Sequence, residues 1–391
     1  MENHEVVIVG GGPAGSTCAH KLAGAGVDVV LFDHSHPREK PCGGGIPAHI
    51  KRIVEIPKEI VDRDIHYILV TDRKGNEARL DQRNGGIVVL RSRLDSHLLQ
   101  TAIDNACVHR REKVTRIRRE GNWIVETENG KVETNVLVGA DGVNSLVRRT
   151  MGSPIPKEHL AMGVCCRITK DKAYMREKFE DMVEFHFVGR PLVETGYFWV
   201  FPKSSEVNVG LMTRLGTPNP TEAFNKLLNT HRRLSGFAQN ENSGVLGYLI
   251  PSATSPSFFD VPTAGKDWLL VGDAAGHVNP ITGEGIYYAM LDGVLAARAY
   301  LDGDVSLFDS YWRRQYGSEM ALSAKLKRFV YSGPLLSTLV RGAARDSKIK
   351  ELLADLVASR RPYGDVLRDV PATLPRLISS QFRRLNPKLA R

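Results

Sequence analysis

The stretch EVVIVGGGPAGSTCAHKLAGAGVDVVLFD, residues 5–33, contains the pattern that decides the fold. It begins with a continuous apolar run, turns on glycines, continues as an alanine-rich amphipathic segment and closes with a second apolar run that ends at Asp33. Continuous apolar runs are typical of parallel strands that are buried on both faces, and the segment between them has helical periodicity. The stretch therefore predicts a βαβ unit.

Three glycines of this stretch, Gly10, Gly12 and Gly15, form the pattern G-x-G-x-x-G between the first expected strand and the helix. In such a turn the first glycine makes the tight bend, the second lets the backbone approach a pyrophosphate, and the third lets helix and strand pack closely. The free N–H groups of the helix then face the phosphates. Asp33 is placed to accept hydrogen bonds from a ribose. The pattern predicts dinucleotide binding and leaves open whether the ligand is NAD or FAD.

A second strand–turn–helix pattern occurs late in the chain, in LLVGDAAGHVNPITGEGIYYAM, residues 269–290. Its strand ends in Gly272-Asp273, and Gly283 and Gly285 precede a helical segment. Asp273 alone is equally consistent with a helix cap. Together, the two patterns predict that a long dinucleotide is held at both ends, which favours FAD.

The remaining chain divides into β-rich and helical parts. Short β-like runs dominate around residues 65–89 and 160–215, and the composition returns to the strand–loop–helix style at Asp267. We expect an α/β fold with a discontinuous Rossmann-type FAD-binding domain (1–64, 85–155 and 265–304), an inserted β-rich substrate-binding domain (65–84 and 156–264) and a basic helical C-terminal region (305–391).

The cysteine content narrows the class of protein. The five cysteines are odd in number and irregularly spaced, which argues against a disulfide framework and against a zinc site. We expect no metal and a reducing compartment. The first expected strand begins almost at Met1, which predicts no secretion signal, and no apolar run is long enough to span a membrane.

The net charge of +9 is unevenly distributed, because residues 341–391 hold 12 Lys and Arg against 5 Asp and Glu. We expect an acidic partner surface, and an anionic membrane fits better than nucleic acid, for which no module is recognisable. The segments at 335–361 and 374–391 alternate apolar and cationic residues at roughly helical spacing. The alternative is a solvated basic helix that packs against the FAD-binding domain. The interpretation is a cytoplasmic protein, peripheral at the inner face of the membrane.

Four segments together resemble the FAD motifs of the p-hydroxybenzoate hydroxylase-like flavoproteins. They are the two glycine turns, GADGVNS at 139–145 and RSRLDSHLL at 91–99, which contains Arg93. Within that superfamily, PCGGG at 41–45 and GYFWVFPKSSEVNVG at 196–210 resemble the geranylgeranyl reductase family, although Lys203-Ser204 stands where many relatives have Lys-Gly.

The resemblance implies FAD as the cofactor and assigns residues to it. The residues implied to line FAD, with the glycines of the two turns, are Gly10, Gly12, Ala14, Gly15, Asp33, Cys42, Gly43, Gly45, Arg93, Val114, Asp273, Gly283, Gly285 and Ile286. Those implied to line the substrate cavity are Tyr197, Trp199 and Phe201.

The aromatic residues also follow a pattern of their own, because positions 197, 199 and 201 of a strand point to one face. Three rings there predict an apolar wall beside the flavin, and ordinary core packing is the alternative. For Cys42 the resemblance implies a thiol at the flavin, with Gly43–Gly45 letting the isoalloxazine ring lie flat against bare backbone. A small buried hydrophobe is the other reading of Cys42.

The resemblance implies FAD-dependent reduction of the prenyl double bonds of a geranylgeranyl lipid. Hydride from reduced flavin N5 needs a proton donor, for which Tyr197, Cys42 and a bound water are the candidates, and the two side chains are the predicted catalytic residues. The electron donor is left open between NADPH, NADH and ferredoxin, the last of which would be a redox partner protein. The alternatives are a flavin monooxygenase or halogenase with an aromatic substrate, and a flavin electron carrier.

Overall fold

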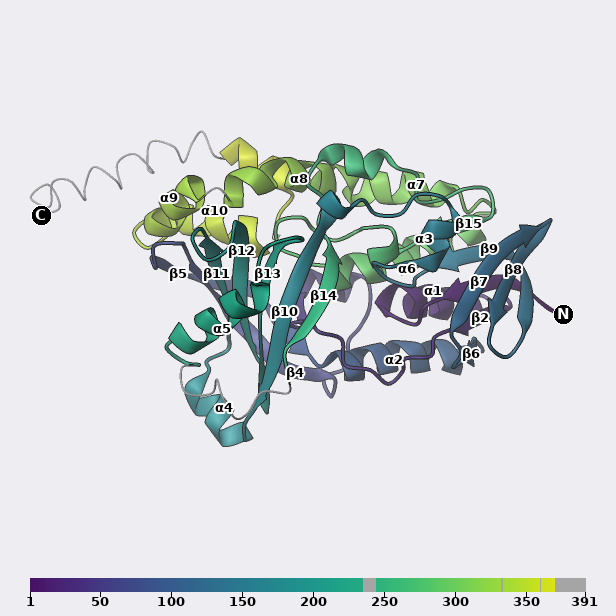
Figure 1. Ribbon diagram of the computed structural model, residues 1–391, viewed down its shortest axis with the longest axis horizontal. Coiled ribbons are helices and arrows are strands. Elements are labelled where there is room, and N and C mark those ends of the chain that lie inside the picture. The colour runs from purple at the N-terminus through teal and green to yellow at the C-terminus, as the bar shows by residue number, and fades with distance from the viewer. Residues whose placement is uncertain (235–243, 332, 359, 370–391) are drawn as a thin grey trace, which may run out of the picture.

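Figure 1 shows the computed structural model of the chain, which describes residues 1–234, 244–331, 333–358 and 360–369. Two sheets form its framework: one of seven strands at the N-terminal side and one of eight strands beside it, with helices packed on both. This architecture confirms the expected α/β class with a Rossmann-like sheet, a further β-rich sheet and C-terminal helices.

The helices alternate with strands in the first part of the chain and follow one another in the last part. Their bounds are α1 Pro13–Ala23, α2 Arg91–Asp104, α3 Leu146–Thr150, α4 Lys172–Lys178, α5 Pro220–Thr230, α6 Ile286–Leu301, α7 Leu307–Trp312, α8 Ser318–Tyr331, α9 Pro334–Ala343 and α10 Ser347–Ala358. Short 3₁₀ turns occur at Ala48–Arg52, Lys157–His159, Pro256–Asp260 and Gly272–Ala274, and a π-helical turn occurs at Arg313–Gly317.

The first sheet is built around the predicted βαβ unit. Strand β1 (Glu2–Val9) pairs in parallel with β2 (Val29–Phe32), and α1 connects them. The strand order is β6-β2-β1-β9-β8-β7, and β15 also pairs with β9. The other bounds are β6 Val108–Arg110, β7 Val114–Glu120, β8 Asn122–Thr127, β9 Lys131–Gly139 and β15 Trp268–Leu270. Strand β15 thereby brings the late glycine turn to the sheet that holds the early one.

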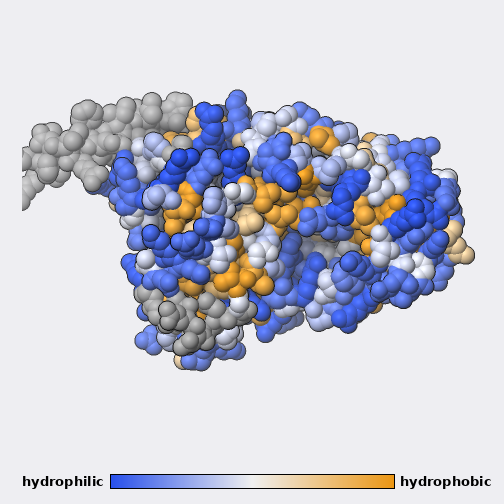
Figure 2. Space-filling model, in the orientation of Figure 1, coloured by the Kyte–Doolittle hydropathy of each residue, from blue (hydrophilic) through white to orange (hydrophobic). Residues whose placement is uncertain are grey.

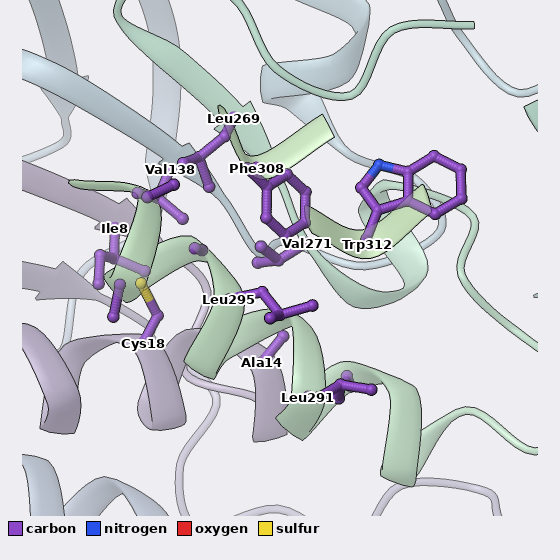
Figure 3. Packing of buried hydrophobic residues seen from close by; sticks show 14 of the residues in the cluster. Ile8, Ala14, Cys18, Val138, Leu269, Val271, Leu291, Leu295, Phe308 and Trp312 are labelled. Carbon is purple, nitrogen blue, oxygen red and sulfur yellow. The ribbon is translucent and has the colours of Figure 1, made fainter. Parts of the chain in front are cut away.

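Helix α6 packs directly against α1 on one face of the first sheet. Figure 3 shows Ala14 of α1 facing Leu291 and Leu295 of α6, with strand side chains behind them. A side chain at Gly293 would place its Cβ 2.6 Å from the Ala14 carbonyl oxygen, so only glycine allows this approach. The two helices that follow the glycine turns therefore lie against each other.

The second sheet is antiparallel except where β11 pairs with β4. Its order is β14-β10-β13-β12-β11-β4-β5-β3. The bounds are β3 Gly45–Pro47, β4 Val61–Thr71, β5 Glu77–Val89, β10 Leu160–Thr169, β11 Met182–Gly189, β12 Thr195–Pro202, β13 Glu206–Arg214 and β14 Leu246–Pro251. Strands β4 and β5 extend beyond the expected 65–84 at both ends, and β3 joins them from the segment that we had placed wholly in the FAD-binding domain.

Helices bury both faces of the second sheet. Met175 of α4 and Phe224 of α5 pack on one face, in a cluster that includes Phe198. On the other face, α9 and α10 contribute Leu339 and Leu353 to the cluster of Tyr197 and Trp199. The apolar faces of α9 and α10 thus lie in the core, against the second sheet rather than against the FAD-binding domain.

The part of the C-terminal region that the structure describes carries paired charges. Lys350 Nζ lies 2.5 Å from Asp81 Oδ2, and both Arg360 and Arg361 contact Asp355, at 3.0 and 2.7 Å. The basic segment 374–391 lies outside the described residues. No helix in the described ranges is both long and apolar enough to cross a membrane. Figure 2 shows hydrophobic residues gathered in the middle of one face, between hydrophilic ends.

Candidate active site

A single cavity of about 930 Å³ extends between the two sheets. The first sheet contributes the glycine turn after β1, the end of β2 and the loop from β15 to α6. The second sheet contributes β3 and the faces of β11 and β12. Both dinucleotide patterns and the aromatic strand therefore line the same space.

The early glycine turn has the geometry that was predicted for it. Gly10 has φ +106°, and its Cβ would lie 2.3 Å from the Ala140 carbonyl oxygen, so only glycine makes this bend. A Cβ on Gly15 would lie 1.9 Å from the Gly10 carbonyl oxygen, which confirms its packing role. Gly12 lines the cavity and caps α1, whose N-terminus has neither a side-chain cap nor an acidic residue in its first turn.

Arg38 completes this turn, and sequence reasoning missed it. Its Nη2 lies 3.2 Å from where a Cβ on Gly12 would be, and its buried Nε has no hydrogen-bond partner among the described residues. Arg38 Nε lies 3.8 Å from Asp95 Oδ2, and a guanidinium held in this way beside the free N–H groups of α1 is suited to a pyrophosphate. The residues of this turn therefore fit the phosphates of FAD.

Asp33 is buried at the end of β2 and is held by backbone donors. Gly11 N donates to its Oδ2 and Ser35 N to its Oδ1, both at 2.7 Å. Burial alone raises the pKa of Asp33, but the hydrogen bond from Ser35 and the charge of Arg38 outweigh it and lower the pKa. The carboxylate therefore stays ionised, as a ribose-binding acceptor must.

The late loop places Asp273 on the cavity, opposite a cation that the sequence did not reveal. Lys40 Nζ lies 2.9 Å from Asp273 Oδ2. Burial raises the pKa of Asp273, but the charge and hydrogen bond of Lys40, together with the charges of Arg91 and Arg38, outweigh burial and lower it. Helix α6 begins at Ile286 with Gly285 at its N-cap, again without a side-chain cap or an early acidic residue. The cavity is thus lined by two uncapped helix N-termini.

A buried network fixes this loop from behind. Asp292 Oδ2 accepts hydrogen bonds from Gly272 N and His277 Nδ1, both at 2.8 Å. Tyr316 also donates to Asp292 through its hydroxyl. Because the three side chains are fully buried or nearly so, they hold the turn between β15 and α6 rather than contact a ligand.

The bare backbone at Gly43–Gly45 is covered by a protein side chain. A Cβ on Gly43 would lie 2.5 Å from the Phe201 ring, and a Cβ on Gly45 would lie 2.6 Å from it. The Phe201 ring thus packs where side chains on Gly43 and Gly45 would lie, and the flat flavin ring expected against this backbone stays a prediction. Cys42 Sγ accepts a hydrogen bond from Gly44 N at 3.4 Å, and Cys42 lines the cavity.

The aromatic wall forms on one face of β12, as predicted. Tyr197, Trp199 and Phe201 all line the cavity, and Phe185 of β11 packs edge-on against Tyr197 and Phe201, with centroids 5.4 Å apart in each pair. Trp199 Nε1 donates to Asn208 Oδ1 at 2.8 Å. Tyr197 and Trp199 are buried core residues, Phe185 and Phe201 are partly buried against the same cluster, and all four rings line the cavity.

Tyr197 has a structural contact that bears on its predicted catalytic role. Its hydroxyl donates to the Thr282 carbonyl oxygen at 2.9 Å, and burial raises its pKa above the ordinary value. The hydroxyl therefore ties β12 to the loop before α6.

The structure places most of the predicted cofactor residues on the cavity, but not Gly15 or Arg93. The predicted residues that line it are Gly10, Gly12, Ala14, Asp33, Cys42, Gly43, Gly45, Val114, Asp273, Gly283, Gly285 and Ile286. The Arg93 side chain is 54% exposed, does not line the cavity and lies 3.8 Å from Asp62. Arg91 lines the cavity instead, fixed by Asp95 through two hydrogen bonds of 2.8 Å.

Two further side chains of the cavity region were missed, Glu284 and His49. Glu284 lies between Gly283 and Gly285 and lines the cavity. His49 Nε2 is 3.8 Å from Glu284 Oε1. In the sequence, an acidic residue between two glycines gave no sign that it would be buried.

A cluster with metal-ligand chemistry lies on the opposite face of the second sheet. Glu184 Oε2 contacts His186 Nε2 at 2.8 Å and His231 Nε2 at 3.0 Å. Arg233 Nη1 also contacts Glu184, at 2.8 Å from Oε1. The Arg233 guanidinium and both imidazoles contact the Glu184 carboxylate directly. We therefore interpret the cluster as a buried ion network.

The cysteines behave largely as packing residues. Cys165 belongs to the core cluster on one face of the second sheet and Cys166 to the cluster on the other, which confirms that adjacent strand positions point apart. Burial raises the pKa of Cys18, Cys165 and Cys166 to about 12. These three thiols therefore stay protonated.

Comparisons with known proteins identify the family of the chain. Residues 4–158 match the family described as pyridine nucleotide-disulphide oxidoreductase. A geranylgeranyl diphosphate reductase from Rhodobacter capsulatus is 33% identical, over 76% of this chain and 74% of that protein. The chain belongs to the geranylgeranyl reductase family. It is an FAD-dependent oxidoreductase, and the expectations for family and cofactor are confirmed.

The chain is also similar to a relative with another name and to a solved structure. A menaquinone reductase from Mycobacterium tuberculosis is 30% identical, over 83% of this chain and 83% of that protein. The crystal structure of a geranylgeranyl bacteriochlorophyll reductase-like protein from Thermoplasma acidophilum superposes with a TM-score of 0.75 at 19% identity, over 95% of this chain and 99% of that one. At that identity the likeness shows the fold.

Proposed function

We propose that this protein reduces carbon–carbon double bonds in the prenyl chain of a geranylgeranyl-type lipid. The observation that carries the proposal is the one cavity that joins both dinucleotide turns to an apolar aromatic wall. The relatives support the same substrate class, because their names give them activity on geranylgeranyl diphosphate and on menaquinone.

The chemistry places two demands on the chain's own residues. When bound, reduced FAD supplies a hydride equivalent. An isolated alkene has no carbonyl to accept electron density, so the cavity must supply a proton and protect cationic character from water. The edge-on pairs that Phe185 forms with Tyr197 and Phe201 make an apolar wall, and the faces of such rings stabilise developing positive charge.

We also expect the protein to collect its substrate at an anionic membrane surface, because prenyl lipids have almost no free concentration in water. Phe329 and Leu335, at the junction of α8 and α9, are 52% and 43% exposed and offer apolar contact there. The electron donor is expected to be NADPH, NADH or a ferredoxin.

The test of the function is the fate of the reduced flavin in the absence of oxygen. Dithionite-reduced holoprotein is mixed anaerobically with geranylgeranyl diphosphate, and we expect the absorbance of oxidised flavin to return only when the lipid is present. A product that forms only with oxygen would instead indicate a monooxygenase or halogenase. Reoxidation of the flavin by a partner protein, at a rate that does not depend on the lipid, would indicate an electron carrier.

A further inference from the structure

Glu284 occupies a position in the cavity that its sequence context did not reveal. It lies in the turn that leads into α6, between Gly283 and Gly285, and all three residues line the cavity. Its side chain is 12% exposed, and its buried Oε1 has no hydrogen-bond partner among the described residues. A buried carboxyl oxygen without a partner is costly when ionised, so this site favours the neutral acid.

The turn around Glu284 is held rigidly by its own backbone and by tyrosines. Glu284 N donates to Thr282 Oγ1 at 3.2 Å, and the Glu284 carbonyl oxygen accepts from Asn279 N at 3.0 Å. Tyr197 and Tyr331 donate to the carbonyl oxygens of Thr282 and Ile281. The Glu284 carboxyl group is therefore carried by a fixed backbone, while its Oε1 has no hydrogen-bond partner among the described residues.

The groups that face Glu284 come from three elements. His49, from the 3₁₀ turn Ala48–Arg52, is nearest at 3.8 Å. Burial and the Arg52 charge lower the pKa of His49 to about 4, so it is neutral at neutral pH and forms no ion pair. Tyr287 and Tyr288 of α6 and Glu319 of α8 are the other titratable neighbours.

These surroundings keep the carboxyl group protonated. Burial, and secondarily the charge of Glu319, raise the pKa of Glu284 to about 8. Among the other candidate side chains, the Tyr197 hydroxyl is engaged as a donor to Thr282 O, whereas Cys42 Sγ accepts a hydrogen bond from Gly44 N. Glu284 thus offers an acidic proton to the cavity at neutral pH.

We propose that Glu284 is the proton donor for the reduction of the prenyl double bond, an inference that rests on the proposed function. The Glu284 O–H bond breaks and a C–H bond forms at one alkene carbon, while the hydride equivalent of reduced FAD forms the C–H bond at the other carbon. The double bond gains two electrons and two hydrogens, and the cofactor is oxidised by two electrons. Glu284 is left as a carboxylate and recovers its proton from solvent water, for which the partly exposed His49 is the adjacent relay.

Glu284→Gln tests the inference, because it keeps the shape of the side chain and removes the acidic proton. Full-length holoprotein is reduced with dithionite and mixed anaerobically with geranylgeranyl diphosphate in a single turnover. We expect unchanged FAD content and a rate of alkene reduction lower by on the order of 10²–10⁴-fold. The wild-type rate should fall as pH rises through about 8, and the residual rate of the variant should lack this dependence.

Infrared spectroscopy of the unreduced holoprotein gives a readout that does not depend on turnover. One component of the carbonyl stretch of protonated carboxylic acids should be present at neutral pH, disappear as pH rises through about 8, and be missing in Glu284→Gln but retained in Glu319→Gln. Glu319→Gln is the matched control. Glu319 is half-buried and has a pKa raised to about 7, but it accepts from Tyr363 N and does not line the cavity. Glu319→Gln should keep alkene reduction within a few-fold.

The outcomes separate the two claims. A wild-type protein that reduces the alkene while Glu284→Gln reduces it equally fast overturns the role of Glu284 and leaves the proposed function standing. Absence of the protonated-acid band at neutral pH also overturns that role. A reduced wild-type holoprotein that leaves the alkene unchanged overturns both claims.

Discussion

Single residues set the shape of the cofactor end of the cavity. Gly12 is the clearest case, because its bare Cα faces the cavity next to Arg38. For Gly12→Val we expect FAD affinity to fall about tenfold or more, equivalent to about 1.4 kcal/mol or more, since a branched side chain fills the space of the pyrophosphate. The ratio of flavin absorbance to protein measures the loss.

Gly247→Val serves as the control for that variant, because nothing lies within 4 Å of a Cβ at Gly247 and it lines no part of the cavity. It should keep its full flavin content. A Gly12→Val protein as yellow as the wild type would contradict the phosphate assignment.

Trp199 shows how one residue can serve the core and the cavity together. Trp199→Phe leaves the Asn208 side-chain oxygen, buried in a residue 2% exposed, without its donor. We expect the free energy of unfolding to fall by about 1–3 kcal/mol with FAD still bound, because the lost partner is buried. Urea denaturation measures this, and Trp199→Phe combined with Asn208→Leu should recover part of it. Loss of flavin in Trp199→Phe would contradict the expectation that the aromatic wall can change without affecting FAD binding.

At the scale of elements, the Tyr197 hydroxyl joins β12 to the turn before α6. Tyr197→Phe should weaken that turn by about 1 kcal/mol, the value of one hydrogen bond. We expect FAD to bind less tightly and single-turnover alkene reduction to change less than it does in Glu284→Gln. A rate loss as large as that of Glu284→Gln, at saturating FAD, would restore Tyr197 as the proton donor.

The Glu184 network joins β11 to the segment after α5 and makes stability depend on pH. Burial alone raises the pKa of Glu184, but the hydrogen bonds from His186 and His231 outweigh it and hold the pKa well below its ordinary value of 4.5. A lowered pKa means that the stabilisation is complete above about pH 4.5 and is lost as pH falls below it.

Glu184→Gln should therefore lower stability at neutral pH and flatten the fall in stability toward acid, measured as urea midpoints between about pH 7 and pH 3. Glu177→Gln, an exposed position on α4, should match the wild type at each pH. Parallel curves for Glu184→Gln and the wild type would contradict the role of the network.

The sequence predicted the local elements better than their long-range partners. The βαβ unit, the glycine roles and the shared face of positions 197, 199 and 201 follow from periodicities of the chain itself. The packing of the Phe201 ring against Gly43 brings together residues far apart in the chain, so no local sequence pattern predicts it. Glu284 was missed for the same reason, because its burial depends on the elements packed around the turn.

At the scale of the whole molecule, the helices α9 and α10 of the C-terminal region are part of the core. The amphipathic pattern of α9 and α10 was visible in the sequence, but whether a membrane or a sheet covers it depends on the rest of the fold. A truncation at residue 341 would remove core helices. Removal of residues 370–391 instead leaves all described residues in place.

Vesicle flotation tests the membrane expectation at this scale. Full-length protein should float with phosphatidylserine-containing vesicles at low salt, and removal of residues 370–391 should weaken flotation, because each Lys or Arg near an anionic surface contributes about 1 kcal/mol. The truncated protein should keep its FAD and its melting temperature. Equal flotation of both proteins would show that the basic segment is not the anchor.

The central claim is that one cavity couples FAD to the reduction of a prenyl double bond. Mass spectrometry of geranylgeranyl diphosphate after a single anaerobic turnover of reduced holoprotein tests it most directly. We predict a product with one double bond fewer for each flavin oxidised, with no oxygen consumed. An unchanged lipid beside reoxidised flavin, or a product that contains oxygen or halogen, would contradict the claim.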